Sequence, residues 1–138
     1  MISAKDVQCQ LCPHLVVSRR QIVETVAVGA PPWNLFVILE APGEQEDRQG
    51  EPAVGPTGRL LRDTIIECGV QSFIIANPVR CHPEGDRTPF AEEIENCSSW
   101  LLQDLMKHRP PVVLLCGATA RKAWSAVEPL GLDFQPRV

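Results

Sequence analysis

The sequence predicts an α/β fold with three layers, in which a short parallel sheet is flanked by helices. Three short apolar runs, at residues 34–39, 72–77 and 111–115, contain β-branched residues and do not alternate with polar ones. Such runs are typical of strands buried on both faces. Helical patterns follow each run, and this alternation favours a parallel sheet. The length of 138 residues and the apolar content of 44% predict one domain, residues 1–138.

The first strand, NLFVIL, is followed by a long loop over residues 40–56 and then by a helix. We expect Thr57 to cap this helix, TGRLLRDTIIEC, and Gly69 to end it. Apolar residues at helical spacing predict its inner face. They are Leu61, Ile65 and Cys68.

The second strand, SFIIAN, leads through a loop rich in proline and charge to a second helix. This helix is predicted to begin near Pro89 or Phe90 and to end near Lys107. Its apolar stripe is Ile94, Cys97, Leu101 and Leu105. The third strand, PVVLL, is followed by a third helix, ATARKAWSAV.

A ligand site is expected at the carboxyl ends of these strands, because ligands of parallel sheets bind there. The loop of residues 40–56 contains glycines, which allow the backbone to approach a ligand closely. It also contains the carboxylates Glu40, Glu46 and Asp47. Burying an unpaired carboxylate is costly, so we expect these groups to face water, an ion or a reacting group.

Four of the six cysteines form a candidate metal site, a C-x-x-C pair plus two single residues. They are Cys9, Cys12, Cys81 and Cys97. Four thiolates suit either Zn²⁺ or an iron–sulfur cluster, and the spacing does not choose between them. The alternative is four unrelated thiols, with Cys97 a small core residue. Cys68 and Cys116 continue apolar patterns and are interpreted as core residues.

Three longer motifs join the C-x-x-C pair. They are LEAPGEQEDRQGEPAVGPTGRLL at 39–61, IIANPVRCHPEGDRTPFAEEIENC at 74–97 and PPVVLLCGATA at 110–120. In this order they resemble the iron–sulfur (family 4) uracil-DNA glycosylases, and the resemblance covers about residues 9–124. It implies a base-excision enzyme whose pocket receives a uracil flipped out of DNA.

The resemblance also implies roles for individual residues. A [4Fe–4S] cluster would be held by Cys9, Cys12, Cys81 and Cys97. The base would be bound by Asn77 and by the turn formed by Ala41, Pro42 and Gly43. The catalytic carboxylates would be found among Glu40, Glu46 and Asp47.

Some features of the family are missing from this sequence. Ala53 stands where the family has a phenylalanine that stacks on the uracil. None of the histidines His14, His82 and His108 lies in the family's late histidine motif, and His82 is interpreted as a solvated loop residue. The chain is therefore expected to be shortened at its C-terminus, to lack the last edge strand, and to have weak or lost catalysis.

A second hypothesis is a non-catalytic iron–sulfur scaffold or binding subunit of a larger assembly, for example one of a phage. A protein partner would then cover the exposed sheet edge, near Trp100 and Trp124. The net charge of −4 does not favour tight nonspecific binding to nucleic acid, although uracil-containing DNA is a possible partner. No apolar run is long enough to span a membrane. A cytoplasmic location is expected, or a virion-associated one for the scaffold.

Overall fold

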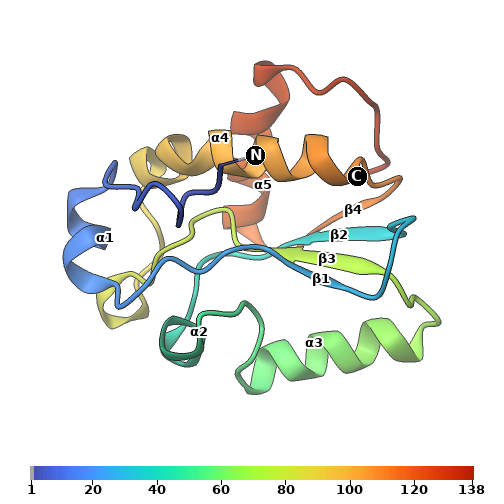
Figure 1. The fold of residues 1–138 in the computed structure, drawn as a ribbon, viewed down its shortest axis with the longest axis horizontal. Helices are drawn as coiled ribbons and strands as arrows, with labels where there is room; N and C mark the ends of the chain where they lie inside the picture. Colours follow the sequence, from blue (N-terminus) through green and yellow to red (C-terminus); the bar gives the residue numbers. More distant parts are fainter. Residues whose placement is uncertain (1) are drawn as a thin grey trace.

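A computed structural model describes residues 2–138 and consists of a four-stranded sheet between helices (Figure 1). The strand order is β1-β3-β2-β4. The strands are β1 (Val26–Val28), β2 (Leu35–Ile38), β3 (Phe73–Ala76) and β4 (Val113–Leu115). The central strand β2 pairs in parallel with β3 and β4, whereas β1 pairs antiparallel with β3. The predicted α/β fold with a mostly parallel sheet is confirmed.

Helices cover both faces of the sheet (Figure 1). The longest, α4 (Ala91–His108), lies with α5 (Ala118–Val127) on one face, and α3 (Pro56–Glu67) lies with α2 (Glu44–Gln49) on the other. The remaining helical segments are α1 (Pro13–Ser18) and the 3₁₀ turns η1 (Glu84–Asp86) and η2 (Glu128–Leu130). No helix in residues 2–138 is long and apolar enough to cross a bilayer.

The strands divide the core between the two faces of the sheet, because alternate side chains point to opposite sides. Phe36 and Ile38 belong to the larger cluster, which also contains Leu101 and Leu105 of α4. Val37 belongs to a smaller cluster with residues of β3 and α3. The members of that smaller cluster are Val37, Ala53, Ile65, Phe73 and Ile75.

Several short elements were not predicted. The sequence analysis missed α1 and β1, and it treated α2 as part of a loop. The sequence of α2, EQEDRQ, has no apolar stripe, and its first turn is instead fixed by the Glu46 side chain, which accepts the N–H of Gly43. The predicted cap of α3 was also wrong, since Gly55 is the N-cap residue and Pro56 begins the helix.

Two further expectations drawn from the sequence need correction, the burial of Cys68 and the exposure of the sheet edge. Cys68 is not a core residue, because it lies at the C-terminal end of α3 and is exposed. The outer edge of β4 is partly paired, since Val112 forms a parallel bridge with Arg137. The N–H of Val113 donates to the carbonyl of Arg137 at 2.7 Å, and the N–H of Arg137 donates to the carbonyl of Pro111 at 2.9 Å.

The contact between α3 and the preceding loop yields a prediction. A Cβ atom on Gly58 would lie 2.4 Å from the Cα atom of Ala53, so Gly58→Ala must displace backbone. We expect Gly58→Ala to lower the free energy of unfolding by about 1–3 kcal/mol, although alanine is the better helix former. Urea denaturation measures this. Asp63→Ala, on an exposed position of the same helix, is the control, and equal stability of the two variants would contradict the packing.

Candidate functional site

A cavity of about 350 Å³ opens at the carboxyl ends of the three parallel strands. Leu39, Glu40 and Ala41 follow β2, Asn77 follows β3, and Cys116 follows β4. The other lining residues are Glu46, Ala53, Thr57, Gly58 and Leu61. The strand β3 lies on one side of β2, and β4 lies on the other. The cavity is therefore at the switch point of the strand order, where open α/β sheets bind ligands. We call it the strand-end cavity.

Asn77 is the buried polar side chain of the strand-end cavity. It is 3% exposed and directly follows the wholly buried strand β3. Its backbone carbonyl accepts a hydrogen bond from Arg80 Nε at 3.3 Å. Within residues 2–138 its side-chain amide has no hydrogen-bond partner. The amide therefore keeps one acceptor and two donors that are not committed to the described residues.

Glu46 holds the loop that forms the wall of this cavity. Its Oε1 accepts the N–H of Gly43 at 3.0 Å, and its Oε2 accepts the N–H groups of Val54 and Gly55 at 3.0 and 2.7 Å. The carboxylate thus joins the two ends of the acidic loop. The same bonds limit the donors of the predicted base-binding turn. Pro42 has no N–H, that of Gly43 is bonded to Glu46, and only the N–H of Ala41 has no acceptor among the described residues.

Asp47 lies outside the strand-end cavity. It is 2% exposed, and its Oδ1 accepts the backbone N–H groups of Arg20 and Gln21 at 2.9 and 3.3 Å. This carboxylate was expected to face water, an ion or a reacting group, but its Oδ1 is satisfied by backbone donors inside the protein. Asp47 is not among the residues that line the strand-end cavity.

Glu40 is the exposed carboxylate of the predicted set. Its Oε2 accepts a hydrogen bond from the Thr119 hydroxyl at 3.1 Å, which ties the loop after β2 to the first turn of α5. Glu40 and Ala41 line the strand-end cavity and also a smaller one of about 170 Å³. Pro42 and Gly43 line only the smaller cavity, opposite Pro83, Asp86 and Arg87.

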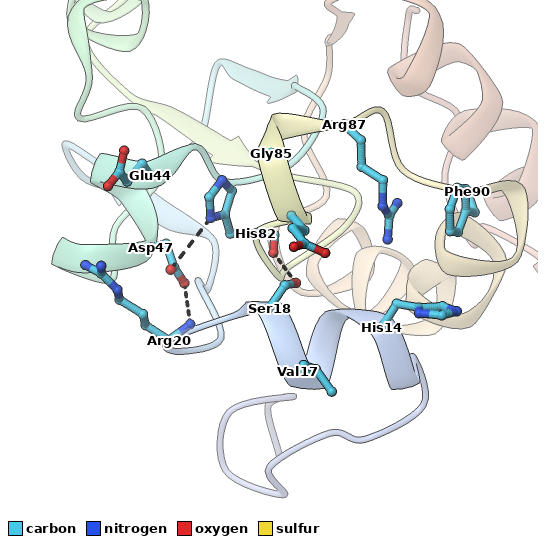
Figure 2. Close-up of a pocket in the computed structure, with 11 residues that line it drawn as sticks. His14, Val17, Ser18, Arg20, Glu44, Asp47, His82, Gly85, Arg87 and Phe90 are labelled. Atoms are coloured by element: carbon cyan, nitrogen blue, oxygen red, sulfur yellow. Dashed lines mark hydrogen bonds and ion pairs between the residues drawn. The ribbon is translucent and has the colours of Figure 1, made fainter.

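The largest cavity, about 570 Å³, lies between α1, α2 and the segment 82–90 (Figure 2). His82 lines it and is not the solvated residue that we expected. Its side chain is 15% exposed, with Nε2 2.7 Å from Asp86 Oδ1 and Nδ1 3.7 Å from Asp47 Oδ2. Carboxylates of Glu44, Asp47 and Glu84 line the cavity as well. Since no strand ends in it, we regard the strand-end cavity as the better candidate site despite its smaller volume.

The segment 82–90 is fixed by an ion pair between Arg87 and Glu93. Arg87 Nη1 and Nη2 donate to the two carboxylate oxygens of Glu93 at 2.8 and 2.9 Å. The guanidinium lies 3.8 Å from the centre of the Phe90 ring. Burial alone would raise the pKa of Glu93, but the bonds from Arg87 and from the N–H of Phe90 outweigh it and hold that pKa below its ordinary value.

The four cysteines predicted to bind a metal line one small cavity of about 20 Å³. Arg19 Nη1 donates to Cys81 Sγ at 3.4 Å, and Asn96 Nδ2 donates to Cys12 Sγ at 3.6 Å. Burial raises the pKa of the Cys97 thiol to about 12, against the opposing effect of the Arg80 guanidinium. In the part of the chain that the structure describes, no three metal-binding side chains meet closely enough to hold a single ion.

Residues 26–133 match the model of the uracil DNA glycosylase superfamily. The chain belongs to this superfamily. It is 35% identical over 122 residues to the type-4 uracil-DNA glycosylase of Thermotoga maritima, a match that covers 87% of this chain and 62% of that protein. The type-4 enzyme of Pyrobaculum aerophilum is 34% identical over 117 residues, which covers 83% of this chain and 58% of the relative.

The type-4 enzyme of Archaeoglobus fulgidus is 36% identical over 95 residues, or 67% of this chain and 48% of the relative. The matches therefore cover between about half and three fifths of the length of these curated proteins. Among the described residues that line the strand-end cavity of this superfamily member, none is aromatic and none is histidine. Ala53 occupies the wall with a φ of 56°, in the left-handed region.

Two features of the site were not found from the sequence. Cys116 was interpreted as a core residue, but it is only half buried and lines the strand-end cavity. Its position directly after β4 was the available signal. The sequence also could not show that the carboxylates of Glu46 and Asp47 accept backbone N–H groups, because the same spacing of acidic residues would suit a catalytic role.

The Arg87–Glu93 pair gives a test of stability against pH. Glu93→Gln should lower the free energy of unfolding by about 2 kcal/mol at pH 7, because it removes a charged partner from two hydrogen bonds. Since the pKa of Glu93 is lowered in the folded protein, its contribution is present above the unfolded value and is lost as the pH falls through the folded one. Chemical denaturation from pH 7 downward measures the difference between the wild-type protein and the variant.

The control for this experiment is Glu92→Gln, at the exposed neighbouring position of the same helix turn. A loss of stability in Glu93→Gln that stays constant down to the lowest pH would contradict the assignment to the charged carboxylate.

Proposed function

We propose that this chain binds uracil flipped out of DNA in the strand-end cavity and cleaves the bond between the base and its sugar. Its relatives carry the name uracil-DNA glycosylase. The observation that supports the proposal most directly is that Asn77, at the carboxyl end of β3, is buried and lines the cavity, and that its side-chain amide has no partner within residues 2–138.

The chemistry of Asn77 suits a uracil edge. Its amide oxygen accepts the N3–H of uracil and its amide nitrogen donates to O4. A cytosine presents the opposite pattern, which does not match the amide in this orientation, and a mismatch at a buried polar group discriminates strongly between bases. The free N–H of Ala41 is available to a second carbonyl of the base.

Glu40 is the carboxylate best placed for the reaction, because it is exposed and lines the same cavity as Asn77. A carboxylate at this point stabilises the positive charge that develops on the sugar as the bond to the base breaks, and it orients the water that adds to the sugar. Glu46 and Asp47 support this by holding the loop in shape.

We expect slow excision. Stacking of a base on an aromatic ring is worth roughly 1–3 kcal/mol, and the described lining residues offer no such ring. A hydrogen-bond donor to the leaving base is worth about 10²–10³ in rate, and these residues include no histidine. The same two observations favour the alternative, a non-catalytic iron–sulfur scaffold or binding subunit of a larger assembly, such as that of a phage.

We also propose that the four cysteines hold a [4Fe–4S] cluster. The donor set fits, because four thiols line one cavity and N–H groups of Arg19 and Asn96 already donate to two of the sulfurs. In such a cluster each thiolate binds its own iron, so the sulfurs surround a space instead of meeting at one ion. When bound, the cluster supplies a cross-link between the N-terminal segment, the loop after β3 and α4.

Base release tests the glycosylase proposal. The cluster-loaded chain is incubated with oligonucleotides that carry one uracil or, as a control, one thymine, and alkali then cleaves any abasic site. We expect slow cleavage at uracil only. Asn77→Ala should abolish it, whereas Asn34→Ala, on an exposed asparagine just before β2 and so at the opposite end of that strand from the cavity residues, should retain it. A folded, cluster-loaded sample that neither binds nor cleaves the uracil strand would favour the scaffold instead.

Metal analysis tests the cluster. We expect about four iron and four sulfide ions per chain, as for a cubane bound by four cysteines. Cys81→Ala should lose the iron and lower the unfolding temperature, whereas Cys68→Ala, which removes an exposed thiol outside the cavity, should change neither. One zinc ion per chain without sulfide would contradict the proposal.

A further inference from the structure

The indole N–H of Trp100, at Nε1, is shut off from solvent and has no hydrogen-bond partner in the described part of the chain. Trp100 lies on α4 three residues after Cys97, and it lines the same small cavity as the four cysteines. Buried tryptophan N–H groups usually find an acceptor, so we expect one here that the described residues do not supply.

Apart from the cysteines, every polar side chain that lines the cysteine cavity carries N–H donors, and those of Arg19, Arg80 and Asn96 already make bonds. Arg80 is committed to ion pairs with Glu24 and Asp104 at 3.0 and 2.6 Å. Asn96 Nδ2 donates to the carbonyl of Leu11 at 3.1 Å and to a cysteine sulfur. The remaining lining residues that are neither cysteine nor donor are apolar. They are Ala4, Leu11, Leu15 and Ile22.

Two N–H donors bonded to cysteine sulfurs and one without a partner, all around four thiols, fit an anionic, sulfur-rich group. We propose that the indole N–H of Trp100 donates a hydrogen bond to a sulfur atom of the cluster, and that it completes a set of three donors with Arg19 and Asn96. This inference rests on the cluster part of the proposed function. It assigns to Trp100 a role in setting the properties of the cluster, with no contact to the DNA base.

The expected consequence is electrostatic. Hydrogen bonds to the sulfurs of an iron–sulfur cluster favour its more negative, reduced state and so raise its reduction potential. Removing the N–H should therefore lower the potential. Removing the N–H should also make the cluster more sensitive to chelators. We expect iron to be lost about fivefold faster, which is the change in rate that corresponds to the loss of one hydrogen bond.

The competing acceptor is a water molecule. A cavity of about 20 Å³ is large enough for one water, which needs at least about 10–15 Å³. A water would satisfy the indole without any effect on the potential of a cluster, so the two acceptors can be told apart.

The test uses the full chain reconstituted with iron and sulfide under anaerobic conditions. Iron and sulfide analysis comes first, because a wild-type chain without a cluster overturns the cluster proposal and this inference together. The chain is then produced with tryptophan labelled with ¹⁵N in the indole ring and loaded with the cluster. After the cluster is reduced, pulsed EPR detects any ¹⁵N nucleus coupled to the electron spin of the cluster. We expect a coupling from one tryptophan.

Two variants assign the signal. Trp100→Phe keeps an aromatic side chain without the N–H, and it should lose the coupling and show a lower potential. Trp124→Phe, on α5 and outside the cysteine cavity, should keep both. A loaded wild-type chain without ¹⁵N coupling overturns the inference alone, even if Trp100→Phe does not fold, and so does an unchanged potential in loaded Trp100→Phe.

Discussion

The arrangement of the molecule depends on the parallel pairing of β2 with both β3 and β4. This pairing brings the residues after three strands to one edge of the sheet, so that Asn77, Glu40 and Cys116 share a cavity although they are far apart in sequence. The two helix layers bury both faces of the short strands, and the strands themselves consist almost wholly of apolar residues. The pairing and burial of the strands therefore fix the positions of the residues that line the cavity.

The acidic loop after β2 is held by its own carboxylates. Glu46 accepts three backbone N–H groups from both ends of the loop, and Asp47 accepts two from the segment after α1. Charged acceptors make the stronger kind of hydrogen bond, so a loop with few apolar residues keeps a defined shape. Of the three predicted catalytic carboxylates, this leaves Glu40 exposed beside the cavity.

The long elements could be predicted because their apolar spacing decides them. Residues 35–38, 73–76 and 118–127 fall within the predicted strands and helix. The elements that were missed, α1, β1 and α2, have six residues or fewer and depend on tertiary contacts. The gathering of four cysteines in one cavity was predicted from their pattern and from the family resemblance, whereas the donors of Arg19 and Asn96 to two of the sulfurs and the unpartnered N–H of Trp100 depend on side-chain geometry that spacing does not encode.

The central claim is that the amide of Asn77 receives a uracil flipped from DNA. It is tested most directly by a crystal structure of the cluster-loaded chain with an oligonucleotide that contains a non-cleavable 2′-fluorodeoxyuridine. The account predicts the uracil in the strand-end cavity, with N3–H and O4 bonded to Asn77. A uracil that stays stacked in the DNA, or that occupies the larger cavity beside His82 (Figure 2), would contradict it.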